Sequence, residues 1–190
     1  MGRTKQLLPW PPGDAAAEKS AKTVVEAAFD VIAGYCDAMV VVLGHEPEAV
    51  KAALGKRVFS CARVNPDTEM VDSIKAGLSF LLEAGQNWGA ALVHPADQPQ
   101  VDPNTIQTLL NEHAKHPWAA IMPEFEGRGG HPVIIPAGLF NSILTFCAHG
   151  GLRQLWIEHP HWRVRVPVND RSVIADLDFP QDYAGSEAAR

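Results

Sequence analysis

The chain has 190 residues, with 16 lysines and arginines against 22 aspartates and glutamates, which gives a net charge of −6. This length fits one domain, and 46% hydrophobic with 20% charged residues is close to the globular average. The composition excludes wholesale disorder, collagen-like repeats and coiled coil. An acidic chain repels phosphate unless cations are placed locally, so generic nucleic-acid binding is also excluded.

The cysteines and the apolar segments indicate the compartment. Cys36, Cys61 and Cys147 make an odd count without CxxC spacing, so we expect no disulfide or zinc framework and a reducing environment. The most apolar region, residues 24–43, contains three acidic residues and cannot be a membrane span. The first residues lead into prolines rather than into an apolar signal stretch. We therefore expect a cytoplasmic protein that contacts no membrane.

Up to residue 122 the pattern predicts a regular alternation of helices and strands. The strands are short, continuous apolar runs, which is typical of strands buried on both faces of a parallel sheet. The alternation therefore predicts an α/β fold with a mostly parallel, doubly wound sheet and helices on both faces. The predicted helices span 15–33, 47–54, 70–84 and 102–116, and the predicted strands span 39–43, 57–63, 90–93 and 118–122.

From Pro123 onward the rhythm changes. The glycine-rich turn 127–130 precedes an apparent strand, 131–136, which has a proline near each end. Prolines at these places favour an edge or antiparallel position. Beyond it the sequence predicts helices over 137–147 and 152–158, a strand over 162–168, and a last short helix that begins at Pro180.

Two aspartates are the candidate metal ligands. Ligands of an open α/β sheet gather beyond the carboxyl ends of its strands, and Asp97 lies in the proline-bounded turn just after the strand 90–93. Asp178 supplies a second carboxylate late in the chain, and two such groups can hold Mg²⁺ against a nucleotide phosphate. The alternatives are that Asp97 forms the turn and that Asp178 caps the helix beginning at Pro180.

Cations and a glycine turn are the other candidate site elements. Arg3 and Lys5 are the cations of the opening segment, and a lysine there can neutralise phosphate charge, although a solvated terminal side chain is the alternative. The turn 127–130 lets backbone amides approach a ligand, with Arg128 or His131 beside them, and a plain hairpin turn is equally consistent with the pattern. No helix follows this turn, so it is not a dinucleotide-binding fingerprint.

Taken together, five segments resemble the MobA-like nucleotidyltransferases, and among them most closely the molybdenum cofactor cytidylyltransferases. The segments are 1–9, 41–45, 96–99, 130–133 and 176–183, in the family's order along nearly the whole chain. The resemblance implies a glycosyltransferase-A-like α/β fold and one domain over 1–190, with 1–122 as the nucleotide-binding half and 123–190 as the acceptor-facing half. It also implies Mg²⁺ as cofactor and a nucleoside triphosphate, CTP, as substrate.

The resemblance assigns roles to individual residues and implies a mechanism. The terminal phosphate of molybdopterin would attack the α-phosphate of CTP in line and release pyrophosphate, with positioning and charge neutralisation supplying most of the acceleration. A downstream molybdoenzyme or its chaperone is the implied partner. The matching positions are Lys5 and Asp97 for catalysis, Arg3, Lys5 and Gly44 for the nucleotide, Gly130, His131 and Pro132 for the acceptor, and Asp97 and Asp178 for the metal.

The sequence departs from the family pattern in two places. The family begins with a central buried strand and a glycine loop that leads into Met-Gly, whereas this chain starts at that Met, so we expect both to be missing from it. In addition, His149 precedes Gly150 where relatives carry an acidic residue. Two alternative functions therefore stay open. One is a non-catalytic nucleotide- or cofactor-binding relative that has lost the triphosphate loop, and the other is a nucleotidyltransferase for another substrate, such as a sugar phosphate.

Overall fold

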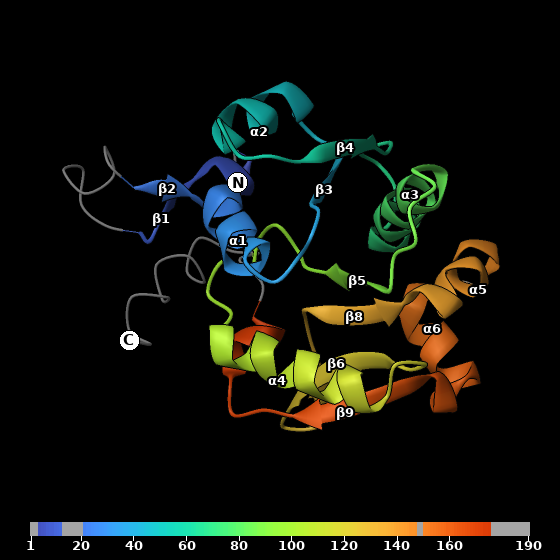
Figure 1. Ribbon diagram of the computed structural model, residues 1–190. Coiled ribbons are helices and arrows are strands. Elements are labelled where there is room, and N and C mark those ends of the chain that lie inside the picture. The colour runs from blue at the N-terminus through green and yellow to red at the C-terminus, as the bar shows by residue number, and fades with distance from the viewer. Residues whose placement is uncertain (1–3, 13–20, 148–149, 176–190) are drawn as a thin grey trace.

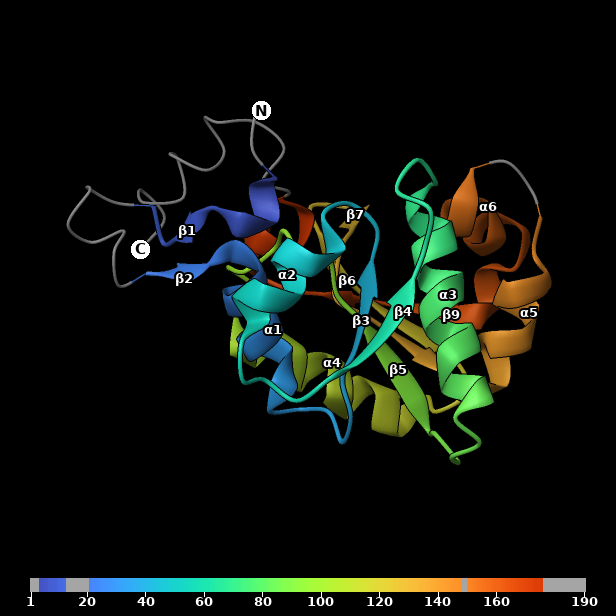
Figure 2. The same ribbon diagram turned by 90° about the horizontal axis from the view of Figure 1, so that it is seen from above.

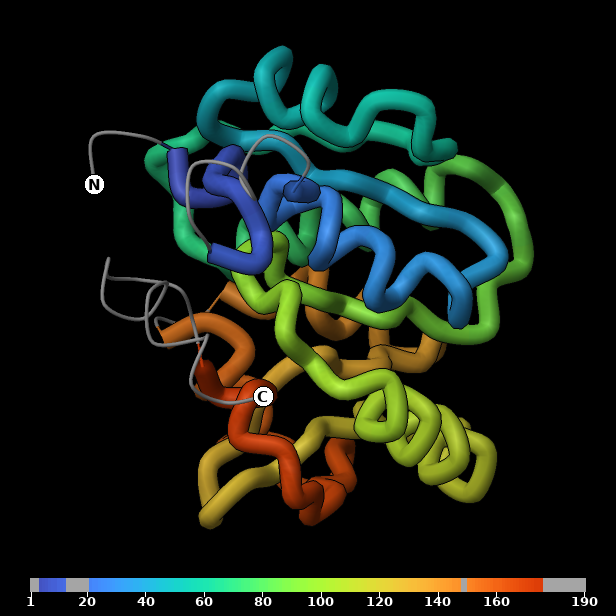
Figure 3. Tube along the Cα trace, turned by 90° about the vertical axis from the view of Figure 1, so that its left-hand side faces the viewer, coloured from blue at the N-terminus to red at the C-terminus, as the bar shows by residue number. Residues whose placement is uncertain are grey.

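The computed structural model describes residues 4–12, 21–147 and 150–175, and it shows a mixed α/β protein (Figure 1). The predicted fold class is confirmed. The first half of the chain forms one side of the molecule and the second half forms the other (Figure 3). None of the described helices is both long and apolar enough to span a membrane.

The larger sheet is built from residues 90–167. Its path is β5–β8–β6–β7, and β9 pairs with the other side of β6. Because β8 is antiparallel to both β5 and β6, and β6 is parallel to β9, the strands β5, β6 and β9 all run in one direction. The bounds are β5 Ala90–Val93, β6 Ala120–Phe125, β7 Arg128–Gly129, β8 Val133–Pro136 and β9 Arg163–Pro167.

Helices cover both faces of this sheet, and strand β8 shows why. Successive side chains of a strand point to opposite faces. Val133 and Ile135 pack with α3, α5 and α6, whereas Ile134 packs with α4. All three are almost completely buried. The helices are α3 Met70–Glu83, α4 Pro103–Lys115, α5 Phe140–Thr145 and α6 Gly151–Glu158.

Strand β8 confirms the antiparallel alternative for residues 131–136 but does not lie at an edge. It sits between β5 and β6 and is buried throughout. Pro136 closes the strand, where the chain turns into a short 3₁₀ helix. The predicted helix that begins at Pro180 lies outside the described residues.

The smaller sheet pairs β3 (Val40–Leu43) with β4 (Ser60–Arg63) in parallel, and α2 (Pro47–Leu54) connects them. Helix α2 has the predicted bounds, with proline in its first turn. The predicted strand 57–63 is wrong at its start, because residues 57–59 are irregular and the strand begins at Ser60.

The first helix also begins later than predicted. Helix α1 spans Val24–Ala33, and Thr23 caps it: its hydroxyl accepts from the Glu26 backbone, while the Glu26 carboxylate accepts from the Thr23 backbone. This reciprocal cap fixes the start of the helix. The preceding residues Lys22–Thr23 form a short strand, β2, which pairs with β1 (Pro9–Trp10). Residues 15–20 of the predicted helix lie outside the described residues.

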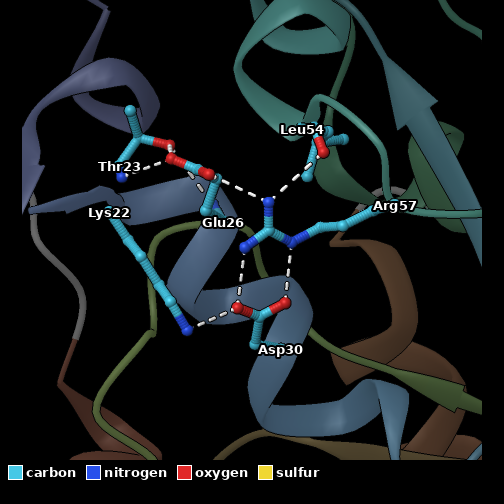
Figure 4. A network of polar contacts seen from close by, with 6 residues as sticks. All are labelled: Lys22, Thr23, Glu26, Asp30, Leu54 and Arg57. Carbon is cyan, nitrogen blue, oxygen red and sulfur yellow. Dashed lines mark hydrogen bonds and ion pairs between the residues drawn. The ribbon is translucent and has the colours of Figure 1, made fainter.

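The polar contacts of Arg57 explain why strand β4 begins later than predicted (Figure 4). Its guanidinium donates to both oxygens of Asp30, at 2.7 Å each, and to Glu26 at 2.9 Å. Lys22 also pairs with Asp30. The pKa of Asp30 is lowered to about 2, chiefly because Arg57 hydrogen-bonds to the carboxylate. This network holds the chain between α2 and β4 against helix α1 and away from the sheet.

Strands β3 and β5 lie near each other but are not hydrogen-bonded together (Figure 2). Within the part of the chain that the structure describes, β3 pairs only with β4, and β5 pairs only with β8. Among the described residues no strand lies between them. As a result, the prediction that both strands are buried on both faces is wrong: only Leu43 of their residues is buried, and the others are half-buried.

Candidate active site

A pocket of about 410 Å³ lies where the carboxyl ends of three strands meet. Gly44 follows β3, Asn65 follows β4, and Ala96 follows β5, and all three line this pocket. The 3₁₀ turn η1 (Lys5–Leu7) closes it on another side through Lys5 and Gln6. The placement agrees with the rule that open α/β sheets bind ligands beyond the carboxyl ends of their strands.

An ion pair between residues far apart in the sequence joins this pocket to a larger cavity beside it: Lys5 lines the pocket, and Asp97 lines the larger cavity. The Nζ of Lys5 lies 2.5 Å from Oδ2 of Asp97, and the two side chains are 28% and 17% exposed. The turn that carries Lys5 is anchored because Leu7 packs against the core cluster containing Val25 and Phe29. The Thr4 hydroxyl also donates to the carboxylate of Glu46, at the start of α2. A lysine and an aspartate are therefore held together beside the pocket at the carboxyl ends of the strands.

Asp97 has the chemistry of a magnesium ligand, but the described residues do not complete a metal site. A carboxylate oxygen is the donor that Mg²⁺ prefers, and this ion usually takes its other oxygens from water and from substrate phosphates. Within residues 4–12, 21–147 and 150–175 no group of three acidic, histidine or cysteine side chains could hold a metal. The second predicted ligand, Asp178, lies outside the described residues.

The turn assigned to the acceptor is held by backbone contacts. Gly130 is buried, its N–H donates to the Pro123 carbonyl, and the N–H of His131 donates to the Val173 carbonyl, both at 2.9 Å. A Cβ on Gly130 would lie 2.1 Å from the Val173 carbonyl oxygen, so only glycine fits. His131 lines the larger cavity, of about 720 Å³, which lies beside the pocket and is lined by residues of β3 and β5. Gly130 and Pro132 are buried beside this cavity and do not line it.

His94, which directly follows β5, also lines the larger cavity. Both of its ring nitrogens are inaccessible to water. The pKa of His94 is lowered to about 4, chiefly because burial disfavours the charged ring; a hydrogen bond with the Gln98 backbone opposes this shift, and nearby His131 adds to it. The ring is therefore neutral at physiological pH.

The structure thus brings together some of the predicted site residues and leaves others apart. Lys5 and Asp97 form an ion pair, Lys5 and Gly44 line the smaller pocket, and Asp97 and His131 line the larger cavity beside it. Arg3 falls outside the described residues, like Asp178. Sequence reasoning missed His94 as a site residue, although its place immediately after a predicted strand was a signal that could have found it.

Comparison with known proteins identifies the family. The model of the MobA-like NTP transferase domain matches residues 1–162. The chain belongs to this family. MobA-like NTP transferases are nucleotidyltransferases, so the match supports an enzyme that acts on nucleoside triphosphates. The ion pair of Lys5 with Asp97 and the residues that line the smaller pocket all lie inside the matched range.

The curated proteins that resemble this chain in sequence are named for different activities. Phosphoenolpyruvate guanylyltransferase of Rubrobacter xylanophilus is 33% identical over 122 residues, which cover 60% of this chain and 58% of that protein, less than two thirds of its length. Nicotine blue oxidoreductase of Paenarthrobacter nicotinovorans is 27% identical over 188 residues, covering 94% of this chain and 85% of that protein. The MobA-like domain of this chain therefore has relatives named for unrelated substrates.

Solved structures share the fold of this MobA-like chain. Rv0371c of Mycobacterium tuberculosis H37Rv superposes with a TM-score of 0.77 at 23% identity, covering 100% of this chain and 92% of that one. A manganese complex of the same mycobacterial protein superposes with a TM-score of 0.71 at 20% identity, covering 98% and 92%. Molybdopterin-guanine dinucleotide biosynthesis protein A of Archaeoglobus fulgidus gives 0.63 at 17% identity, covering 97% and 94%. At these identities the likeness shows the fold alone.

Proposed function

We propose that this nucleotidyltransferase transfers the cytidylyl group of CTP to the terminal phosphate of a molybdopterin-type acceptor and releases pyrophosphate. The observation that carries the proposal is the 2.5 Å pair of Lys5 and Asp97 at the carboxyl ends of the strands. Phosphoryl and nucleotidyl transfer need charge neutralisation and positioning rather than a nucleophilic side chain. A lysine beside a carboxylate in such a pocket supplies both kinds of group.

Each residue of the pair has its own role in this proposal. The ammonium group of Lys5 neutralises the triphosphate, and the Asp97 carboxylate holds the divalent cation, Mg²⁺. When bound, the cation polarises the α-phosphate and offsets the charge of the departing pyrophosphate. In the free chain the two side chains neutralise each other. A triphosphate with its cation replaces that single contact by two, which keeps both half-buried charges paired throughout binding.

The remaining predicted residues complete the proposal. Gly44, half-buried at the pocket wall, leaves room for the nucleotide beside the backbone. Arg3 adds a second cation for the triphosphate, and Asp178 adds the second metal ligand. The turn Gly130 to Pro132 presents His131 to the acceptor. Residues 1–122 then bind the nucleotide, 123–190 face the acceptor, and the product passes in the cytoplasm to a molybdoenzyme or its chaperone.

A second candidate keeps the chemistry and changes the substrates. The relative with the highest identity named above is a guanylyltransferase of phosphoenolpyruvate, which favours GTP and a small phosphorylated acceptor over CTP and molybdopterin. The position of Lys5 and Asp97 suits either triphosphate, because neither side chain reads the base. The base and acceptor must therefore be assigned by competition.

The test is a pyrophosphate-release assay with CTP, GTP and ATP, each offered molybdopterin or phosphoenolpyruvate in the presence of Mg²⁺. We expect turnover with CTP and molybdopterin that is lost in Asp97→Asn. The matched control is Glu83→Gln, which changes an exposed carboxylate at the end of α3 and should leave turnover unchanged. Turnover only with GTP and phosphoenolpyruvate would establish the second candidate. Binding of nucleotide without pyrophosphate release from any pair would instead support a non-catalytic binding protein.

A further inference from the structure

We propose that Asp170 and Thr105 are positioning residues of the active site. They act through the segment 170–175, here called the 170–175 clip, which holds the turn of His131 and the loop of Asp97 in fixed places. Asp97 and His131 line the same cavity, although one follows β5 and the other lies just before β8. The catalytic consequence rests on the proposed function, whereas the structural link can be measured on the chain alone.

The clip is bonded to the loop between β5 and α4, which carries the candidate metal ligand. The Nε2 of Gln100 donates to the carbonyl of Ala175, the last residue of the clip, at 2.7 Å. The backbone N–H of Asp102 donates to Oδ2 of Asp170, the first residue of the clip, at 3.1 Å. The loop is therefore attached to both ends of the clip.

The middle of the clip holds the turn on the acceptor side. This middle part is the 3₁₀ turn η4 (Arg171–Ile174), and its Val173 carbonyl accepts from the N–H of His131 at 2.9 Å. The backbone of Gly130 lies against the same carbonyl so closely that a Cβ there would be 2.1 Å from the oxygen. Val173 is fully buried. A shift of η4 therefore displaces His131.

The carboxylate of Asp170 joins these two sets of contacts. Its Oδ1 accepts from the backbone N–H of Ser172 at 2.9 Å and from the Ser172 hydroxyl, which caps η4. Its Oδ2 accepts from Asp102 and from Oγ1 of Thr105 at 2.9 Å. Hydrogen bonds to an ionised carboxylate are stronger than those between neutral groups. One oxygen thus orients η4, while the other binds it to the start of α4.

The contact from Thr105 goes beyond capping η4. The cap needs only the donors of Ser172, whereas the Thr105 hydroxyl reaches the same carboxylate from 65 residues away in the chain. Thr105 is buried, with 6% of its surface exposed. Its helix α4 is fixed on the sheet, because Leu109 packs in one core cluster with Ile134 of β8. The hydroxyl therefore ties η4 to a fixed part of the fold.

This link matters because transfer between two bound substrates depends on accurate placement of the groups around them. A misplacement of about 1 Å can lower the rate about 100-fold. Both His131 and Asp97 belong to segments that the clip holds, so their separation across the cavity depends on it. Loosening the clip should slow transfer while leaving the fold in place.

The first arm of the test measures hydrogen exchange by NMR at the backbone amide of His131, on the 190-residue chain without substrates. Thr105→Val removes the hydroxyl and nearly keeps the shape, and Thr105→Ser restores the donor. Thr108→Val is the matched control, since the Thr108 hydroxyl donates within α4, to the Asn104 carbonyl at 2.8 Å. We expect exchange at His131 to rise at least about threefold in Thr105→Val only.

A reference amide separates local loosening from lower overall stability. Leu78 is buried in α3, away from the clip, and its amide reports global unfolding. We expect Thr105→Val to raise the exchange rate of His131 more than that of Leu78. Asp170→Asn gives a second variant, because an amide has one accepting oxygen where the carboxylate uses two, and it should raise the His131 rate at least about tenfold.

The second arm measures catalysis. Asp97 is also held by Lys5, so we expect calorimetry to give the same nucleotide affinity in every variant within about twofold. We expect kcat for pyrophosphate release with the acceptor to fall at least about threefold in Thr105→Val and at least about tenfold in Asp170→Asn. Thr105→Ser and Thr108→Val should turn over like the wild type.

Four results would count against the proposal in different ways. Unchanged exchange at His131 in both Thr105→Val and Asp170→Asn would overturn the structural link. Equal acceleration at His131 and Leu78 would show a role in overall stability only. Faster exchange at His131 with unchanged kcat would overturn the positioning role. If the wild type releases no pyrophosphate with any substrate pair, the proposed function fails and the catalytic role with it, while the exchange rates still confirm or overturn the link to His131.

Discussion

Replacing Gly130 with alanine should destabilise the fold strongly, although the turn that carries it lies beside the active-site cleft. The added Cβ would lie 2.1 Å from the carbonyl oxygen of Val173 and 2.6 Å from its carbonyl carbon. Carbon and oxygen that are not bonded normally stay about 3.3 Å apart, so the two segments must separate by about 1 Å. The Val173 carbonyl accepts from the N–H of His131 at 2.9 Å, and Val173 is fully buried.

The expected loss follows from these two contacts. Breaking the hydrogen bond costs about 1 kcal/mol, and overpacking a well-packed site costs about 1–3 kcal/mol. We therefore expect Gly130→Ala to lower the free energy of unfolding by about 2–4 kcal/mol, measured by urea denaturation with an unchanged slope. Gly138→Ala is the control, since nothing lies within 4 Å of a Cβ there, and it should change stability by less than about 0.5 kcal/mol. A Gly130→Ala protein as stable as the control would refute the assigned contact.

Three further predictions concern stability. Arg57→Met removes the guanidinium that donates to Asp30 and Glu26, and it should cost about 1–2 kcal/mol in a urea melt because these contacts are partly exposed. The pKa of Asp30 lies at about 2 in the folded chain against an ordinary 3.8, so its contribution is complete above about pH 4 and is lost as the pH falls toward 2. The stability difference between wild type and Arg57→Met should shrink across that window, and a constant difference from pH 5 to 2 would contradict the assignment. Ile135→Val, at a position with no solvent exposure, should cost about 1 kcal/mol by thermal or urea denaturation, and a neutral effect would show that the helix layer on that face repacks.

Local signals in the sequence were enough to place most elements. Pro47 and Asp102 fixed the starts of α2 and α4, because proline in the first turn and an aspartate cap act on neighbouring residues only. The Asp102 side chain does accept from the Asn104 backbone at 2.8 Å. Likewise Gly85, with a positive φ of 67°, ends α3 as expected.

The predictions were wrong or incomplete where the structure depends on contacts between residues far apart in the sequence. The start of β4 depends on Arg57 reaching Asp30, 27 residues away in the chain, and no local pattern reports that contact. Apolar runs at β3 and β5 predicted burial on both faces, but burial also requires a neighbour on each edge, which periodicity does not show. The order β5–β8–β6 likewise depends on long-range pairing.

The candidate site shows the same division. The position of Asp97 after a strand was readable from the sequence, because the rule for strand ends needs only the order of elements. Its ion pair with Lys5 spans most of the first half of the chain and was not predicted, since the family resemblance only assigned each residue a separate role at the nucleotide and metal site. The shielding of the His94 ring nitrogens from water could not be predicted, since it depends on packing between residues far apart in the sequence.

The central claim, that Lys5 and Asp97 form the metal and triphosphate site, is tested most directly by calorimetric titration of the chain with CTP in the presence and absence of Mg²⁺. We predict saturable binding that requires the cation and is weakened at least about tenfold by Asp97→Asn or Lys5→Met, each loss being about 1.4 kcal/mol or more. Glu83→Gln should bind like the wild type. Equal binding by the wild type and both site variants, with or without Mg²⁺, would contradict the claim.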